Sequence, residues 1–264
     1  MSASYYHRRF VDLIWTDNLA TTRDSYIPIT FTGPTDARLP GGGGDRLTIY
    51  TIRPDLLGVV DNVFKNSSTN DRRYDFFEVS FKAPLPRNGF VLTAWTFGKT
   101  HTNACEVEDP NDLRFCDTKL PVRHIYKLSG GIPLPFDLML SGTFQVYDTP
   151  GGGYSLTPPY ISARYAVNSA IAGYPLTGGG SININLLPPG RLFNDYYKVL
   201  DVRLAKTFTT GRLKTTAVAE FDNLFNLTSV VQVTEAYAPG SATWLRPNVV
   251  QRGRNVRWGL QMRF

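Results

Sequence analysis

Two cysteines and two of the three histidines are the first side chains that could do chemistry. They occur in the order His101, Cys105, Cys116 and His124. Zinc sites use these residue types, but their ligand pairs are normally separated by about two to five residues. The order found here contains no Cys-x-x-Cys or His-x-x-x-His pair, so it is not a recognised zinc pattern. A disulfide between the cysteines, free thiols and a metal site remain three alternatives at this point.

The glycine runs and the histidines indicate no catalytic or cofactor site. Consecutive glycines occur at 41–44, 151–153 and 178–180. None is followed by Gly-Lys-Ser/Thr, as a phosphate-binding loop requires, so we expect flexible loops there. The histidines, with His7 as the third, are scattered, and no nucleophile–base pair follows from their spacing. We therefore expect no enzymatic activity and no cofactor.

Alternation of apolar and polar residues is the main sign of secondary structure. At the C-terminus Val256, Trp258, Leu260, Met262 and Phe264 are apolar, and the residues between them are polar or Gly. This period of two is typical of a strand with one apolar and one polar face. The same alternation predicts strands at 77–85, 136–146, 200–208 and 213–222, and less regular segments at 3–15, 90–100 and 122–132 predict three more.

The links between these predicted strands are alternately short and long. Short turns are expected at 86–89, which contains an Asn-Gly pair, at 133–135 and at 209–211. Long links alternate with them, at about 16–72, 103–120, 148–195 and 226–251. Such alternation is typical of outer-membrane barrels, in which short turns face the periplasm and long loops face outward. The sequence therefore predicts an all-β fold, part of a transmembrane antiparallel β-barrel with about eight strands.

The composition agrees with this interpretation and excludes other classes. The 264 residues include 13% aromatic residues, 23 Gly and 18 Pro, which favour many strands and turns. No apolar stretch approaches the ~20 residues of a membrane-spanning helix. The net charge of +6 is scattered along the chain, so nucleic-acid binding gains little support. Residues 1–15 lack the apolar core of a signal peptide.

In such a barrel, the polar faces of the strands would line the lumen. The lumen-facing set that we predict carries both signs of charge and consists of Glu78, Lys82, Asp201, Arg203, Lys214, Glu220, Arg257 and Arg263. These residues would contact a plug or guide a solute. The simpler alternative is that they only solvate a polar interior. Cys105 and Cys116 would share one external loop on the oxidising side of the membrane, which favours the disulfide.

The end of the chain carries two more specific motifs. The apolar row from Val256 to the terminal Phe264 matches the signal that the outer-membrane barrel assembly machinery recognises, although a soluble sandwich can end in a similar strand. Upstream, a strand at 201–208 and a glycine turn precede the motif Asn223-Leu224-Phe225-Asn226. This arrangement resembles the end of TonB-dependent receptors, and the segments 10–20, 39–44, 104–116 and 185–190 resemble the Oar-like branch of that family.

The resemblance implies an importer of a scarce or bulky solute in the outer membrane of a Gram-negative bacterium. The family barrel has about 22 strands and follows an N-terminal plug and a TonB-contacting segment. Residues 1–264 are then expected to be a C-terminal part of the barrel, with no plug domain. The expected partners are outer-membrane lipid, the assembly machinery, the missing barrel and plug, TonB through the missing N-terminal part, and an unknown solute.

Two other functions fit the same pattern. Eight strands can close into a barrel of their own, and long loops could then act in adhesion. A soluble all-β binding module would instead bury a core between two sheets. The first is opposed by the resemblance to the end of a larger barrel, and the second by links that are too long for a compact sandwich.

Overall fold

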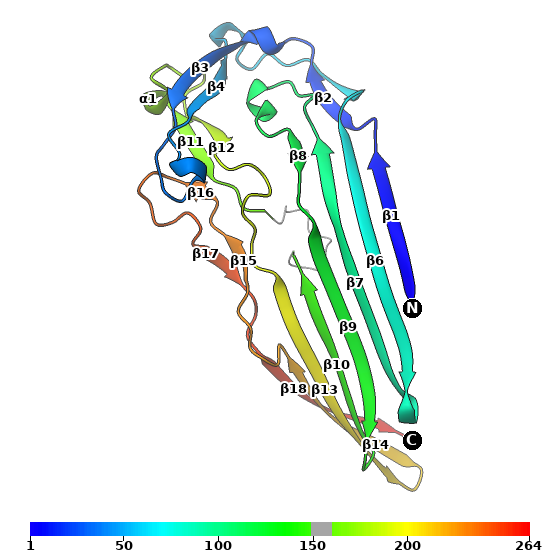
Figure 1. The fold of residues 1–264 in the computed structure, drawn as a ribbon. Helices are drawn as coiled ribbons and strands as arrows, with labels where there is room; N and C mark the ends of the chain where they lie inside the picture. The colour runs from blue at the N-terminus through cyan, green and yellow to red at the C-terminus, as the bar shows by residue number, and fades with distance from the viewer. Residues whose placement is uncertain (149–159) are drawn as a thin grey trace.

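A computed structural model describes residues 1–148 and 160–264 of the chain. It confirms the all-β prediction, and every pairing in its largest sheet is antiparallel. Figure 1 shows the long strands of this sheet side by side, with the smaller sheets gathered at one end. The glycine run at 151–153 and part of the predicted loop at 148–195 lie outside the described residues.

The largest sheet has nine strands, and eight of them follow one another in chain order from edge to edge. These eight are β1 (Ser2–Phe10), β6 (Asp71–Leu85), β7 (Gly89–Asn103), β9 (Arg123–Leu134), β10 (Leu138–Tyr147), β13 (Tyr197–Thr210), β14 (Leu213–Asp222) and β18 (Asn255–Arg263). The ninth, β8 (Asp117–Lys119), pairs with the last residues of β7. Each predicted strand matches one of the eight, but the segment 3–15 is broken after Phe10 and only its first part joins this sheet.

Three short turns connect neighbouring strands at one end of the sheet. The short helix η4 (Pro86–Asn88) links β6 to β7, and Gly211 and Arg212 link β13 to β14. The third turn lies at 135–137 rather than 133–135, because Pro133 and Leu134 still pair with β10. Backbone geometry explains the shift, since Phe136 and Asp137 hold the positive φ angles of the turn.

The long links carry secondary structure that the alternation of apolar and polar residues does not predict. They contain β2 (Ile14–Asn18), β3 (Tyr26–Thr32), β4 (Arg46–Ile52), β5 (Asn62–Asn66), β11 (Arg164–Asn168), β12 (Ser181–Asn185), β15 (Val230–Val233), β16 (Ala236–Tyr237), β17 (Pro247–Val250) and the helix α1 (Ser169–Ala172). The described part of these links also contains four 3-10 helices, η1 (Arg23–Ser25), η2 (Pro40–Gly42), η3 (Pro54–Leu56) and η5 (Pro110–Leu113). Within the described residues, no helix is long and apolar enough to cross a membrane.

The two faces of the large sheet differ in chemistry. Paired residues of antiparallel strands point to the same side, so each row of pairs belongs to one face. One such row is apolar and runs through Ile132, Leu140, Leu204, Ala219 and Trp258. The adjacent row of pairs points to the opposite face and is polar, with Ser141, Arg203, Glu220 and Arg257. The period of two in the sequence therefore separates an apolar face from a polar face.

The large sheet has two open edges. Within the described residues, β1 pairs only with β6 and β18 only with β14, and the two edge strands do not pair with each other. Figure 1 shows the sheet as a curved wall with β1 on one side and β18 on the other. The sheet is thus not closed into a barrel.

The well-buried core lies outside the large sheet, in what we call the loop lobe. The loop lobe is formed by β3, β4, β11, α1, β12, β16 and the segment around Trp244, which come from three different long links. Its buried apolar residues are Ile29, Phe31, Leu39, Leu47, Ile49, Ala163, Tyr165, Val167, Ala172, Leu176, Ile184, Leu187, Tyr237 and Trp244. Burial of these side chains from water is the main stabilising term for this part of the chain.

Candidate functional site

The polar face of the large sheet holds a ladder of alternating charges. Glu220 lies between Arg203 and Arg257, with nitrogen–oxygen distances of 3.4 Å to each. Arg257 also contacts Asp222, at 3.1 Å. The four side chains remain partly exposed, so each pair contributes little stability on its own. Their position on one face instead gives that face a fixed pattern of both charges.

A shallow hollow of about 350 Å³ lies over this ladder. Its polar lining comes from Ser129, Ser141, Thr143, Asp201 and the charged ladder. The register also brings Lys82 to this face, because the row Lys82, Leu92, Ser129, Thr143 and Asp201 is continuous across the sheet. All members of the set predicted to face the lumen share this face: Glu78, Lys82, Asp201, Arg203, Lys214, Glu220, Arg257 and Arg263.

The opposite face is apolar and uncovered. On the edge strand β18, Trp258, Leu260 and Met262 are 77%, 71% and 56% exposed, and Val256 points to the same face. Phe264, which follows the strand, is 95% exposed. Large apolar side chains of β6, β7, β9 and β13 are also exposed, among them Phe77, Phe81, Trp95, Ile132 and Leu204. A soluble protein rarely leaves so continuous an apolar surface in water. This face therefore needs an apolar environment.

The motif at 223–226 forms the exit from β14. Asn223 is buried and adopts a positive φ of 51°, a conformation that asparagine tolerates better than most residues. Its side-chain amide donates to the carbonyls of Leu227 and Arg252, and its oxygen accepts from the Leu227 amide. Asn226, also at positive φ, accepts from the Arg254 amide. The two asparagines thus join the end of β14 to the start of β18, whereas Leu224 bonds to β13 through its backbone and Phe225 is exposed.

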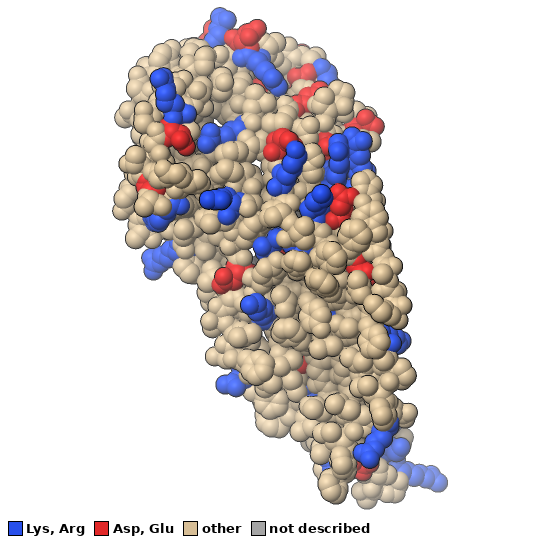
Figure 2. All heavy atoms as spheres, in the orientation of Figure 1, with Lys and Arg blue, Asp and Glu red and all other residues tan. Residues whose placement is uncertain are grey.

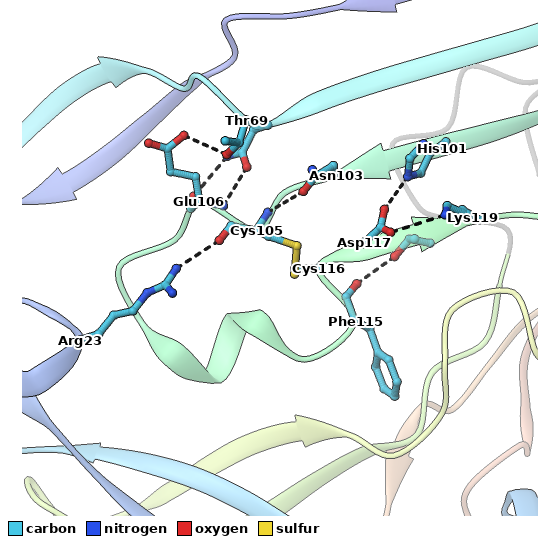
Figure 3. The surroundings of a disulfide bond; sticks show 12 residues. Arg23, Thr69, His101, Asn103, Cys105, Glu106, Phe115, Cys116, Asp117 and Lys119 are labelled. Carbon is cyan, nitrogen blue, oxygen red and sulfur yellow. Dashed lines mark hydrogen bonds and ion pairs between the residues drawn. A yellow bond between two sulfur atoms is a disulfide. The ribbon is translucent and has the colours of Figure 1, made fainter.

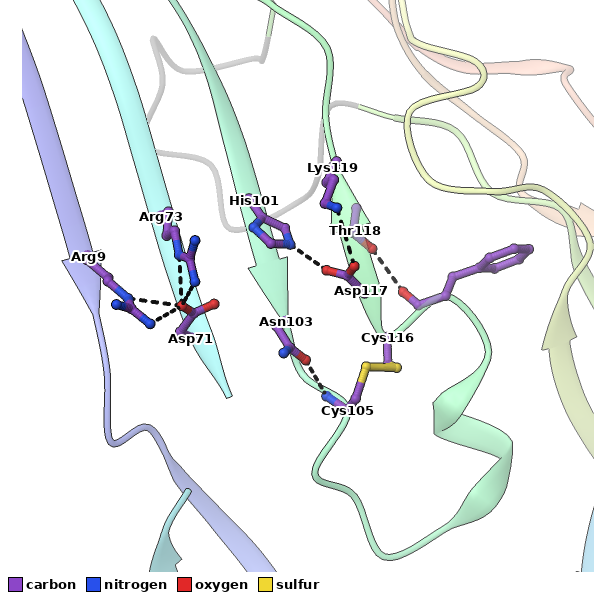
Figure 4. A network of polar contacts seen from close by, with 11 residues as sticks. Arg9, Asp71, Arg73, His101, Asn103, Cys105, Cys116, Asp117, Thr118 and Lys119 are labelled. Carbon is purple, nitrogen blue, oxygen red and sulfur yellow. Dashed lines mark hydrogen bonds and ion pairs between the residues drawn. A yellow bond between two sulfur atoms is a disulfide. The ribbon is translucent and has the colours of Figure 1, made fainter. Parts of the chain in front are cut away.

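Cys105 and Cys116 form a disulfide, with their Cα atoms 4.9 Å apart (Figure 3). The bond closes the link between β7 and β8, next to the last pair of that hairpin, Asn103 and Asp117. Because both sulfurs are consumed in the bond, neither is a thiolate that could bind a metal. His101 contacts Asp117 (Figure 4). His124 instead stacks on Trp95, with ring centroids 5.7 Å apart. The disulfide is therefore the alternative that this structure contains.

The disulfide-closed loop, residues 105–116, contacts the other long links. Glu106 accepts hydrogen bonds from Ser67 and Thr69, and these bonds hold the pKa of its carboxyl below the usual value. Asn111 pairs with both backbone groups of Tyr50, at 2.9 and 2.8 Å. Arg114 donates to the carbonyl of Asn185. One short loop thus bonds to two segments that lie far apart in the sequence.

A group of ion pairs lies at the end of the large sheet opposite the short turns. Asp71, at the start of β6, is almost buried and contacts Arg9 of β1 at 2.8 Å and Arg73 at 2.6 Å (Figure 4). One carboxylate oxygen of Asp71 accepts from both arginines. The contact fixes the C-terminal end of the edge strand β1 against β6.

The loop lobe is tied together by a cluster around Asp36. Arg38 donates to Asp36 through its side chain, at 2.7 Å, and lies over the ring of Trp244. Tyr237 donates its hydroxyl to the same carboxylate, at 3.1 Å. The bonds from Arg38 hold the pKa of Asp36 well below its usual value, and burial together with Asp36 raises the pKa of Tyr237 to about 12. Trp244, which lies in the long link 226–251, is buried and donates to the carbonyl of Ser162.

Comparison with known proteins gives no match: no family model fits the chain, and no curated protein or solved structure is significantly similar. Among the described residues, no group of three or more His, Cys, Asp or Glu side chains is arranged to hold a metal ion. The geometry above is therefore the basis for a functional conclusion.

Proposed function

We propose that this chain forms part of the wall and outer loops of an outer-membrane β-barrel, of the TonB-dependent receptor type, that imports a solute. The observation that carries the proposal is the two-faced sheet, with an uncovered apolar face and a polar face that bears charges of both signs. Lipid would cover the first face, and the second would line the lumen. In this role the chain has no catalytic residue.

The dimensions of the sheet support a membrane position. Its eight long strands have nine to fifteen residues, against the about 9–11 that cross a bilayer when tilted. Figure 2 displays charged side chains mainly over the end that carries the long links, and few over the lower strands. A belt with few charges between a charged outer end and short turns is the surface expected of a barrel in a bilayer.

The open edges support membership of a larger barrel. Lipid provides no partner for the unpaired backbone groups of β1 and β18, so each edge requires another strand. Further strands of the receptor would supply these partners, and the plug would fill the space in front of the charge ladder. The apolar row that ends at Phe264 would be the segment recognised by the barrel assembly machinery.

Cysteine labelling in intact cells tests the proposed topology. The full receptor is produced in its Gram-negative host with either Ala242→Cys, in the last long link, or Arg212→Cys, in a short turn. Both positions are exposed, and the native cysteines are bonded to each other. A membrane-impermeant maleimide should label the Ala242 variant in intact cells, and the Arg212 variant only after the outer membrane is permeabilised.

Other results would overturn the proposal. Equal labelling of both variants in intact cells would contradict the opposite placement of turns and long links. Recovery of the chain in the soluble fraction would favour a soluble binding module. If the chain alone, extracted from the outer membrane, migrates as a compact heat-modifiable species, the self-contained eight-stranded barrel with adhesive loops becomes the better account.

A further inference from the structure

A band of aromatic rings crosses four neighbouring strands on the apolar face of the large sheet. Tyr5 of β1 contacts Phe77 of β6, with ring centroids 4.7 Å apart, and Phe77 stacks on Phe97 of β7 at 5.7 Å. Trp95 of β7 lies 4.6 Å from Phe97 and 5.7 Å from His124 of β9. The register places all five rings on the face that lipid would cover. Because aromatic side chains gather at the headgroup level of a membrane, this band marks the outer boundary of the apolar region.

Beyond this band, towards the long links, the same face becomes cationic. Two residues further along each strand, about 7 Å away, the first charged row begins, and a second row follows it. We call the basic side chains of these two rows the outer patch: His7, Arg9, Arg73, Lys99, His101 and Lys119. Figure 4 shows Arg9, Arg73, His101 and Lys119 in this order across β1, β6, β7 and β8. The outer patch and the aromatic band are therefore adjacent on one face.

The two arginines of the outer patch share a single carboxylate. Asp71 is only 6% exposed, and one of its oxygens accepts from both Arg9 and Arg73. The two arginine side chains are themselves 51% and 42% exposed. Their contacts with Asp71 are made by Nε and Nη2, so Nη1 of each guanidinium is not used by this carboxylate. The pair thus presents positive charge and fixes two donors in place.

The other two carboxylates on this face of the four strands mainly contact histidines. Asp75 accepts from Tyr5 and contacts His7. Asp117 contacts His101, and its other oxygen lies 3.8 Å from Lys119, whose side chain is 72% exposed. Lys99 is exposed as well. Two arginines and two lysines therefore stand against three carboxylates, the least exposed of which neutralises only one of the arginines. The exposed charge of the outer patch is positive.

We infer that the outer patch binds the phosphate groups of an anionic lipid in the outer leaflet, with the acyl chains of that lipid on the aromatic band and the apolar face below it. A guanidinium matches a phosphate with two parallel hydrogen bonds, and lysine adds a point charge. Basic side chains immediately beyond the apolar region lie where lipid headgroups carry their phosphates. The inference rests on the proposed function, because it requires the apolar face to lie in a membrane.

The test measures lipid binding to the full receptor purified in a non-ionic detergent. The probe is diphosphoryl lipid A, and native mass spectrometry counts the lipid molecules bound. The comparison probe is the same lipid after removal of both phosphates, and inorganic phosphate is added as a competitor. The diphosphoryl form should bind at least about 10-fold more tightly than the phosphate-free form. Inorganic phosphate at the same concentration should not displace it, because it lacks the acyl chains that cover the apolar face.

A double variant tests whether the outer patch carries this binding. Lys99→Gln together with Lys119→Gln should weaken binding of the diphosphoryl lipid about 25-fold, since each lysine near a membrane surface contributes about 5-fold. Both side chains are exposed, so the variant should fold normally. Lys127→Gln is the matched control and should leave binding unchanged. Lys127 is an exposed lysine of β9, and its pairing with Ala94 places it on the polar face.

The inference is overturned if both lipid forms bind equally, if the double variant binds as well as the unchanged receptor, or if the Lys127 variant loses as much binding. Displacement by inorganic phosphate would also overturn it, because the outer patch would then be a site for a free anion. The cysteine labelling above separates these failures from failure of the proposed function. Absence of lipid binding with the labelling pattern intact would refute only the lipid assignment.

Discussion

At the scale of single residues, Asp36 shows how one carboxylate joins two long links. It accepts from Arg38, which follows it in the first link, and from Tyr237 in the last. Arg38 also donates to the carbonyl of Ser241, at 3.0 Å. An acidic group with two charge-assisted or polar partners is stabilised in its ionised form. The loop lobe should therefore respond to pH through this residue.

The loop lobe should lose stability in acid. Because the pKa of Asp36 is lower in the folded chain than its usual 3.8, the ionised carboxylate stabilises the folded state above that value. That contribution is lost as the pH falls from about 4 towards the lowered folded pKa. Thermal unfolding of the full receptor, followed by near-ultraviolet circular dichroism of buried aromatic residues such as Trp244, should show a falling midpoint in this window.

Asp36→Asn should reduce the stability of the loop lobe at neutral pH and flatten the acid response. Asp55→Asn is the control, because Asp55 is 60% exposed and its ion pair is with the neighbouring Arg53. An acid response that is the same in both variants would assign the effect to other carboxylates.

At the scale of elements, the strands of the large sheet are defined by which face is apolar. Leu140 and Thr143 lie on β10, three positions apart, and point to opposite faces. Leu140 pairs with Ile132 and Leu204 in an apolar row, whereas Thr143 pairs with Ser129 and Asp201 in a polar row. Substitutions at these two positions therefore compare the two faces of the sheet within a single strand.

An arginine should be tolerated at only one of these two positions. Leu140→Arg would place a charge in lipid, at a cost of about 2–4 kcal/mol near the bilayer midplane. Thr143→Arg would place the same charge beside Asp201, on the wetted face. We expect the Leu140 variant to lose most of its assembled protein in outer-membrane fractions, and the Thr143 variant to keep it. The opposite order would exchange the lipid and lumen faces.

Elements with strict alternation could be predicted from the sequence, and those of the loop lobe could not. In the strand that contains Trp258 and Leu260, apolar residues occur at every second position over the whole length. Its secondary structure and its two faces therefore follow directly from the sequence. β3 and β4 are short, and β3 contains Pro28, so their pattern is weak within a long link. Their burial depends on β11 and β12, more than 100 residues away in the sequence, and no local pattern contains that information.

The candidate sites divide in the same way. The charges around Glu220 could be assigned to one face because position along a strand fixes the side. The hollow of about 520 Å³ that Arg123 and Asn194 line could not be anticipated, because these two residues become neighbours only through the order of β9, β10 and β13. Asn194 stands in a long link and carries no sequence signal of its own.

At the scale of the whole molecule, the disulfide-closed loop adds a second connection between the first and third long links, which already share the core of the loop lobe. It bonds to Ser67 and Tyr50 of the first link and to Asn185 of the third. Figure 3 shows Arg23 and Thr69, both of the first link, beside Cys105 and Glu106 next to the disulfide. Loss of the disulfide should therefore affect more than its own loop.

Cys105→Ser together with Cys116→Ser should destabilise the loop lobe by about 2–3 kcal/mol, the value expected for closing a short loop. Trypsin should then cut the receptor in intact cells after Arg114, which is exposed and lies within the freed loop. The expected product is a new fragment boundary, identified by mass spectrometry. Unchanged protease resistance would show that Asn111 and Glu106 hold the loop without the covalent bond.

The shared core of the loop lobe also has a mechanical consequence. Trp244, Ile49 and Val167 come from three links that leave the wall at different strands, yet they are buried in one cluster. A displacement of any one link must therefore carry the other two, or else break the packing around Trp244. Opening of the outer end would therefore move the loop lobe as one rigid body relative to the large sheet. A single crosslink between the loop lobe and the large sheet would then be enough to prevent this movement.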